Sequence, residues 1–218
     1  MAALGIALFL AGAMVVLLVT GVARRPVQPK GLLYFMRRVP RMAIADVGDG
    51  VKARLVGKVV ATELLSSPLT GTPCVFFQVV VHMTGRELPI IREQVGVSFA
   101  IVEDGARAVV DPDHAELSLV FAGKHSSGTF NQPTAAEKAL LDKHKVRYQG
   151  LALDEQLWYH EAVIAPGETI TVCGQGVRDA DPQAVAGGLY RDPPPTLLSL
   201  RGSPAEPLLI SNDPDLLG

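Results

Sequence analysis

Residues 66–81 read Ser66-Ser67-Pro68-Leu69-Thr70-Gly71-Thr72-Pro73 and then Cys74-Val75-Phe76-Phe77-Gln78-Val79-Val80-Val81, and this stretch decides the fold class. Its first half combines proline and glycine with hydroxyl side chains, which is typical of a turn. Its second half is apolar except for one glutamine, which is typical of a strand buried on both faces. The stretch therefore predicts a mainly β domain.

Other strand-sized runs flank this stretch on both sides. Residues 51–60 alternate apolar and polar side chains over much of their length, and residues 97–103 and 106–111 enclose Asp104-Gly105. Asp-Gly supplies the positive φ angles of a two-residue hairpin turn. Further strands are expected at 116–122, at 156–164 and 168–174 around the turn Ala165-Pro166-Gly167, and as short apolar runs at 196–200 and 207–211.

One helix is expected at 134–145, because Thr134-Ala135-Ala136-Glu137 fits a capping box and good helix formers follow it. About 170 residues lie beyond residue 45, enough for one domain with its own core. The predicted fold of this domain is β-rich α+β: a curved sheet or partly closed barrel that carries one inserted helix.

The first 23 residues contain no charged side chain, and a run of about 20 apolar residues matches the thickness of a bilayer. They predict a transmembrane anchor. A cleaved signal peptide is the alternative, since Gly21-Val22-Ala23 offers small residues for a peptidase, but the run is too long and lacks a basic n-region.

The stretch directly after the anchor contains six basic residues and no acidic residue, and no basic residue precedes the anchor. The six are Arg24, Arg25, Lys30, Arg37, Arg38 and Arg41. Because such charge is retained in the cytoplasm, the sequence predicts an external N-terminus and a cytoplasmic body. These basic side chains are also expected to attract anionic lipid headgroups at the membrane surface. The predicted organisation is an anchor at 1–23, a basic linker at 24–45, a β-rich domain at 46–212 and a tail at 213–218.

The rest of the chain is acidic. Without the six cations, 14 basic residues stand against 22 acidic ones, a net charge of −8. An acidic body with few aromatic residues argues against nucleic acid as a partner. The two cysteines, Cys74 and Cys173, lie in apolar runs. They are expected to be free and buried if the body faces a reducing compartment, whereas a disulfide between them would indicate the opposite topology.

Several segments together resemble the GIDE domain, also called the beside-a-membrane domain. The segments are 65–77 (Leu-Ser-Ser-Pro-Leu-Thr-Gly-Thr-Pro-Cys-Val-Phe-Phe), 100–105 with 109–111, 159–161 continuing through 164–168 to 172–174, and 207–212. The resemblance implies a β-rich domain next to a membrane. The residues that carry it are expected to be structural: Ser67, Pro68, Leu69, Thr70, Gly71, Pro73, Cys74, Asp104, Gly105, Asp111, Glu161, Pro166, Gly167 and Gly174.

The family is best known from MULAN-type E3 ubiquitin ligases of the mitochondrial outer membrane. There the domain lies between two transmembrane helices, faces the intermembrane space and precedes a RING finger. This sequence has no second apolar segment after Asn212 and no RING set of zinc ligands, and so looks like a RING-less, bacterial relative.

Three hypotheses on function follow. The first is a membrane-anchored module that binds an unidentified protein, with lipid contacted through the anchor. The second is a ubiquitin-ligase-type function that requires a separate RING partner. The third is a structural role, in which small residues of the anchor pack helices together.

Candidate chemistry in the sequence is weak, and no catalytic, cofactor-binding or metal-binding residue is predicted. Ser67 lies outside a Gly-x-Ser-x-Gly elbow. Asp111-Pro112-Asp113-His114 has no EF-hand continuation and is interpreted as a turn, as is Gly174-Gln175-Gly176. The five histidines share no short spacing.

Glu161 is the exception, because it interrupts an apolar strand. A carboxylate there must face solvent or be paired, and Arg54, Lys58 and Arg92 are the cations considered as partners. Its default interpretation is structural.

Overall fold

The computed structural model describes residues 31–121, 123–128, 130–147, 156–180 and 196–217. The predicted anchor at 1–23 lies outside these residues, and so does the basic stretch up to residue 30. Within the described ranges, no helix is both long and apolar enough to cross a membrane.

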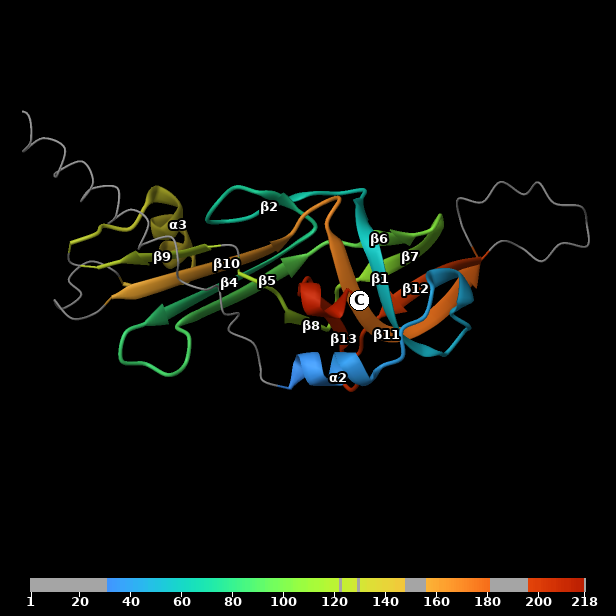
Figure 1. Ribbon diagram of the computed structural model, residues 1–218. Helices are drawn as coiled ribbons and strands as arrows, with labels where there is room; N and C mark the ends of the chain where they lie inside the picture. The colour runs from blue at the N-terminus through green and yellow to red at the C-terminus, as the bar shows by residue number, and fades with distance from the viewer. Residues whose placement is uncertain (1–30, 122, 129, 148–155, 181–195, 218) are drawn as a thin grey trace, which may run out of the picture.

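Five strands close into a barrel, seen on the right of Figure 1. In order around the barrel they are β1 (Lys52–Ala61), β6 (Phe99–Glu103), β7 (Ala106–Asp111), β12 (Thr196–Arg201) and β11 (Thr169–Ala180), which pairs back onto β1. The β7–β12 pair is parallel and the other pairs are antiparallel. In chain order this is a 1-2-3-5-4 barrel, the Greek-key connectivity of an OB-fold.

The predicted mainly β fold with a curved sheet or partly closed barrel is confirmed, and the barrel closes fully. Its interior contains Leu55, Ile101, Val110, Ile170 and Leu200, each buried. Two short strands, β13 (Leu208–Ser211) and β8 (Ala115–Ser118), extend the sheet from the edge of β11.

Two long insertions between barrel strands pair with each other to make a second sheet, on the left of Figure 1. Its order is β5 (Ile91–Gly96), β4 (Phe76–Met83), β10 (Leu157–Ile164) and β9 (Gly123–Ser127). One insertion connects β1 to β6 and supplies β4 and β5, and the other connects β7 to β11 and supplies β9 and β10. Helix α3 (Ala135–Lys143) packs on one face of this sheet.

Side-chain alternation divides the second sheet between two cores. Val79 and Val81 of β4 face α3, together with Tyr159 of β10. Val80 and Ala162 point to the other face and join the barrel core. The prediction that β4 is buried on both faces is confirmed, because each face of this strand meets a different apolar layer.

Two local predictions are also confirmed. Thr134 and Glu137 form both bonds of the capping box at the start of α3. Asp104 and Gly105 both have positive φ, 48° and 84°, as a primed hairpin turn between β6 and β7 requires.

Several boundaries differ from the sequence prediction. β8 ends at Ser118 rather than at 122, β11 continues to Ala180, and β5 and β9 were not predicted. Both are edge strands of the second sheet, and their polar sequences lack the alternation that marks a half-buried strand.

The predicted turn at Gly174-Gln175-Gly176 is wrong, because both glycines lie inside β11. A Cβ added at Gly174 would lie 2.3 Å from Leu208 Cδ1, and one at Gly176 would lie 2.8 Å from Leu198 Cδ1. Glycine at these positions allows close packing of side chains on the barrel wall and does not form a turn.

Helical segments also occur where only a linker and a tail were expected. Helix α2 (Leu32–Arg38), which lies below the barrel in Figure 1, packs against the 3-10 helix η2 (Pro214–Leu216). A second 3-10 turn, η1 (Ile44–Asp46), precedes β1. Leu32 and Met36 are buried with Leu216 and Cys173. Packing of these side chains, rather than helix propensity over seven residues, explains α2.

Candidate functional site

Glu161 of β10 is buried on the α3 side of the second sheet and is bound by the turn at residues 67–72. Its carboxylate accepts hydrogen bonds from the Leu69 N–H at 2.8 Å and the Thr70 N–H at 3.1 Å. The hydroxyls of Ser67, at 3.1 Å, and of Thr70 also donate to it. The prediction that a buried carboxylate here must be paired is therefore confirmed.

The partners of Glu161 are hydrogen-bond donors of the turn and not the cations considered from the sequence. Arg54 instead donates to the Leu216 carbonyl at 3.0 Å. These donors lie 91 to 94 residues before Glu161 in the chain, so no local pattern could reveal them. The several N–H and O–H bonds from the turn compensate the burial of the carboxylate without a cation next to it.

The turn itself is closed by its own hydrogen bonds. The Gly71 N–H donates to the Ser67 carbonyl at 3.0 Å, and the Thr72 N–H donates to Ser67 Oγ at 3.0 Å. Gly71 has φ +68°, which suits glycine. Because the Ser67 hydroxyl already donates to Glu161, its geometry fits a structural role in this turn and not that of a nucleophile.

A cavity of about 330 Å³ lies between this turn, β9, β10 and α3. Its lining comes from all four elements and is mainly apolar, and it consists of Leu69, Thr70, Thr72, Lys124, His125, Thr134, Glu137, Tyr159, Glu161 and Val163. The size and the mixture of apolar wall with a few converging polar groups are those of a ligand site.

Buried polar groups on the far wall of the cavity also hold one another. Glu137 accepts from His125 Nδ1 through one oxygen and from the Thr134 N–H, at 2.7 Å, through the other. The Tyr159 hydroxyl is 2.9 Å from Ser127 Oγ. Burial raises the pKa of Tyr159, and the charge of Glu137 adds to this against the lowering effect of the Ser127 bond, so the phenol stays protonated.

The structure brings only some of the predicted motif residues together. Ser67, Leu69 and Thr70 donate to Glu161, and Gly71 closes the same turn. Leu69, Thr70 and Glu161 also line the cavity. His125, Glu137 and Tyr159 line it too and were not predicted. The capping box identified Glu137 as a cap, but its second partner, His125, comes from an unpredicted strand.

The remaining motif residues belong to turns and packing elsewhere. Asp111 accepts the Asp113 N–H at 3.1 Å in the turn after β7, which agrees with the structural interpretation of that segment. Pro166 and Gly167 form the turn between β10 and β11, and Gly167 has a φ of +83°. Pro73 starts the short strand β3 (Pro73–Cys74), which pairs with β2 (Leu65–Ser66) and thereby fixes both ends of the 67–72 turn.

Both cysteines are buried and free, which is the arrangement expected for a body that faces a reducing compartment. Burial raises the pKa of Cys74, and the negative charge of Glu161 raises it further. Burial raises the pKa of Cys173 to about 12. Both side chains are therefore thiols at neutral pH, which is the form that neither attacks carbonyl carbon nor binds metal well. In the described part of the chain, no group of three His, Cys, Asp or Glu residues is arranged to hold a metal ion.

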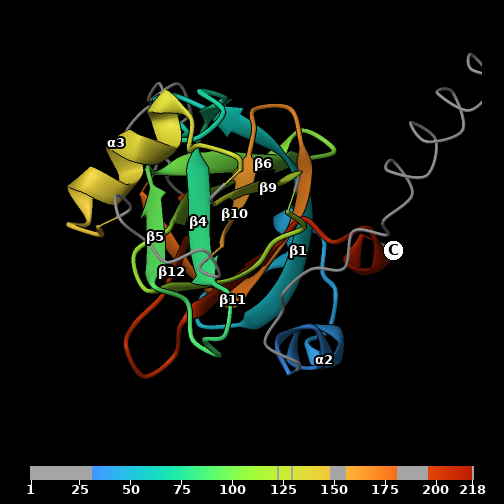
Figure 2. The ribbon, with the colours of Figure 1, turned by 90° about the vertical axis from the view of Figure 1, so that its left-hand side faces the viewer.

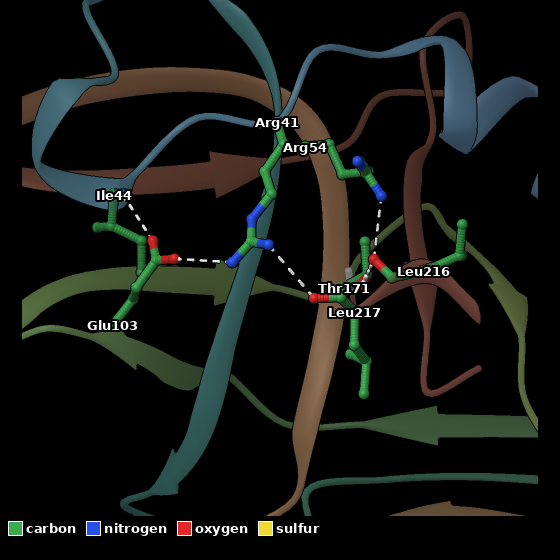
Figure 3. Close-up of polar contacts among 7 residues, drawn as sticks. All are labelled: Arg41, Ile44, Arg54, Glu103, Thr171, Leu216 and Leu217. Atoms are coloured by element: carbon green, nitrogen blue, oxygen red, sulfur yellow. Dashed lines mark hydrogen bonds and ion pairs between the residues drawn. The ribbon is translucent and has the colours of Figure 1, made fainter. Parts of the chain in front are cut away.

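A second polar cluster fastens both ends of the described chain to the barrel (Figure 3). Arg41 contacts Glu103 and the Leu217 carbonyl, each at 3.4 Å, while Arg54 Nη1 and the Thr171 hydroxyl donate to the Leu216 carbonyl. Glu103 also accepts the Ile44 N–H at 3.1 Å. Arg41, expected only as a cation near the membrane, thus has a structural role.

A comparison of the chain with models of known protein families gives no match, and comparisons with curated proteins and with solved structures give none either. The resemblance to the GIDE domain therefore stays a prediction.

Proposed function

We propose that this chain is a membrane-anchored binding module, and that the cavity beside Glu161 receives an apolar side chain of a protein partner. The membrane part of the proposal rests on residues 1–23 and on the cations that follow them. The binding part rests on the cavity and on the state of its polar groups.

The observation that carries the binding role is that the buried polar groups of the cavity already have hydrogen-bond partners. Glu161 accepts from the 67–72 turn, Glu137 accepts from His125 and Thr134, and Tyr159 bonds with Ser127. An incoming apolar group would break none of these bonds, and it would remove from water the apolar wall formed by side chains such as Leu69 and Val163. This arrangement favours recognition by shape.

The same arrangement gives little support to catalysis. A general acid or base needs a proton-accepting atom within reach of substrate, whereas both oxygens of Glu161 are bound by the turn. The buried thiols do not favour a catalytic-cysteine ligase mechanism. The ubiquitin-ligase hypothesis rests on the family resemblance alone.

Substitution of one cavity wall provides the test. Val163 lines the cavity, and Val95 lies in the same cross-strand row on β5, on the far side of Phe77. Val163→Trp fills the cavity, whereas Val95→Trp adds the same side chain at an exposed edge of the same sheet. The two variants differ in whether the added indole occupies the cavity.

The probe is a displayed peptide library, selected against the full-length chain in detergent micelles. Peptides with an apolar anchor residue should be enriched and should bind Val163→Trp at least about tenfold more weakly than the wild type, a loss of about 1.4 kcal/mol. Val95→Trp should bind them like the wild type. Equal binding to Val163→Trp, or loss on Val95→Trp alone, would place recognition elsewhere.

A further inference from the structure

Helix α2 has one face buried and one face uncovered in the structure. Leu32 and Met36 are buried, but Tyr34 and Phe35 are 57% and 61% exposed. Single exposed apolar residues are ordinary on protein surfaces. Two adjacent aromatic rings on the outside of a helix are a larger apolar surface that calls for an explanation.

The exposed rings are combined with arginine. The Tyr34 and Phe35 rings meet edge to face with centroids 5.9 Å apart, and the Arg38 guanidinium lies 5.0 Å from the centre of the Tyr34 ring. Arg37 is 3.3 Å from Asp215, so part of its charge is compensated. Aromatic rings and arginines side by side are typical of the boundary between lipid headgroups and acyl chains, where the rings enter and the cations stay at the surface.

The chain length before α2 limits how far this helix can be from the predicted anchor. Residues 24–30 number seven, and seven extended residues span at most about 25 Å. They include Arg24, Arg25 and Lys30, so the sequence directly before the helix carries three positive charges. The rings of α2 are thus held close to the surface that the anchor would enter.

We infer that the exposed face of α2 lies in the headgroup region of an anionic bilayer and fixes the orientation of the whole domain. The inference rests on the membrane anchor proposed above and adds a second contact with lipid. The occupant is an anionic lipid surface, because cations accompany the rings and the chain before them leads to an apolar segment.

This orientation turns the candidate binding site away from the membrane. In both views α2 lies at the bottom of the molecule, whereas α3 and the short strand β2 lie near the top (Figures 1 and 2). The cavity is lined from α3 and from the turn that follows β2. A partner would therefore reach the cavity from the aqueous phase.

The test uses the full-length chain in vesicles with an environment-sensitive fluorophore on one introduced cysteine. Phe35→Cys reports on α2. Leu64→Cys is the matched control, since Leu64 is similarly exposed, at 53%, and follows the end of β1 that lies opposite α2 in Figure 1. Cys74 and Cys173 are buried and label slowly.

In vesicles that contain phosphatidylserine, we expect a quencher attached to lipid near the headgroups to reduce the emission at position 35 at least twofold, and to leave position 64 unchanged. Arg38→Gln should lower quenching at position 35. If the chain floats with the vesicles but quenching is equally weak at both positions, the inference is overturned. A chain that does not float would overturn the anchor, and the inference with it.

Discussion

The barrel and the inserted sheet solve the problem of stability in different ways. The barrel closes on itself, so its main-chain groups pair around the ring, and its interior is apolar. The inserted sheet is open and is stabilised partly by buried polar groups, with Glu161, Glu137 and Tyr159 each hydrogen-bonded to other side chains or to the backbone. The barrel is thus a scaffold, and the insertions carry the cavity.

The comparison also explains why the candidate site lies where it does. Buried polar groups stabilise a structure only when all their hydrogen-bond partners are in place, so they are sensitive to substitution. In the inserted sheet, residues 67–72 of one insertion supply the partners of Glu161 in the other insertion. A cavity formed between two such loops can change with little effect on the barrel.

The largest effect is expected in the barrel core. Leu55→Ala removes a fully buried side chain and should lower the free energy of unfolding by about 3 kcal/mol. Urea denaturation measures this loss. Because the second sheet shares its inner face with the barrel core, hydrogen exchange should accelerate in both regions. Leu141→Ala, in α3, is the matched substitution and should accelerate exchange mainly around α3. Identical exchange patterns would show that the two regions are one cooperative unit.

The next effect concerns the buried carboxylate. Glu161→Gln replaces a carboxylate that only accepts hydrogen bonds by an amide that also carries donors, so the turn loses part of its hydrogen bonding. The free energy of unfolding should fall by about 2 kcal/mol. Exchange of the Leu69 and Thr70 amide protons should increase most. Glu116→Gln, on the exposed face of β8, should change stability by less than about 0.5 kcal/mol. Unchanged protection at the turn would refute its attachment through Glu161.

A smaller, pH-dependent effect should come from the other face of the inserted sheet. Burial lowers the pKa of His160, and the charges of His82 and Lys124 lower it further. The unfolded chain, with a histidine pKa near 6.5, then binds the proton more readily. Stability from this group is present above about pH 6.5 and decreases as the pH falls from there towards the lower folded pKa.

Replacement of this histidine isolates its contribution. His160→Gln should lose less stability than the wild type between about pH 7 and about pH 5.5, as followed by thermal unfolding. His114→Gln, in the turn after β7, serves as the control outside the inserted sheet. A wild-type slope in His160→Gln would mean that the pH sensitivity lies in another group.

The smallest effect is expected at the surface of α2. Arg37 and Asp215 form an exposed ion pair at 3.3 Å, and such pairs contribute little. Arg37→Gln should change the free energy of unfolding by less than about 0.5 kcal/mol in urea denaturation. A loss above about 2 kcal/mol would show that this contact is needed to dock α2.

The sequence predicted those features that have a local cause. An apolar run indicated β4, Asp104-Gly105 indicated a hairpin, and Thr134 with Glu137 indicated the start of α3. Each depends on neighbours within a few residues in the chain. The mainly β class followed from several such elements.

The rest depended on contacts between distant segments. The closure of the barrel requires β1 to pair with β11. The cavity requires β9 and the 67–72 turn, which are far apart in the sequence, both to contact β10. Edge strands such as β5 carry charged side chains that resemble a loop. Glu161 could be identified as unusual, but its partners could not be chosen from sequence, because donors on a turn leave no charge pattern.

The most direct measurement on the cavity is a methyl NMR titration of the full-length chain with a peptide selected by display. Val163 lines the cavity and Val95 lies in the same row outside it, so their methyl groups report on two places of one sheet. We expect the Val163 methyl signals to shift with the peptide while those of Val95 stay in place. Shifts at Val95 with none at Val163 would contradict the assignment of binding to this cavity.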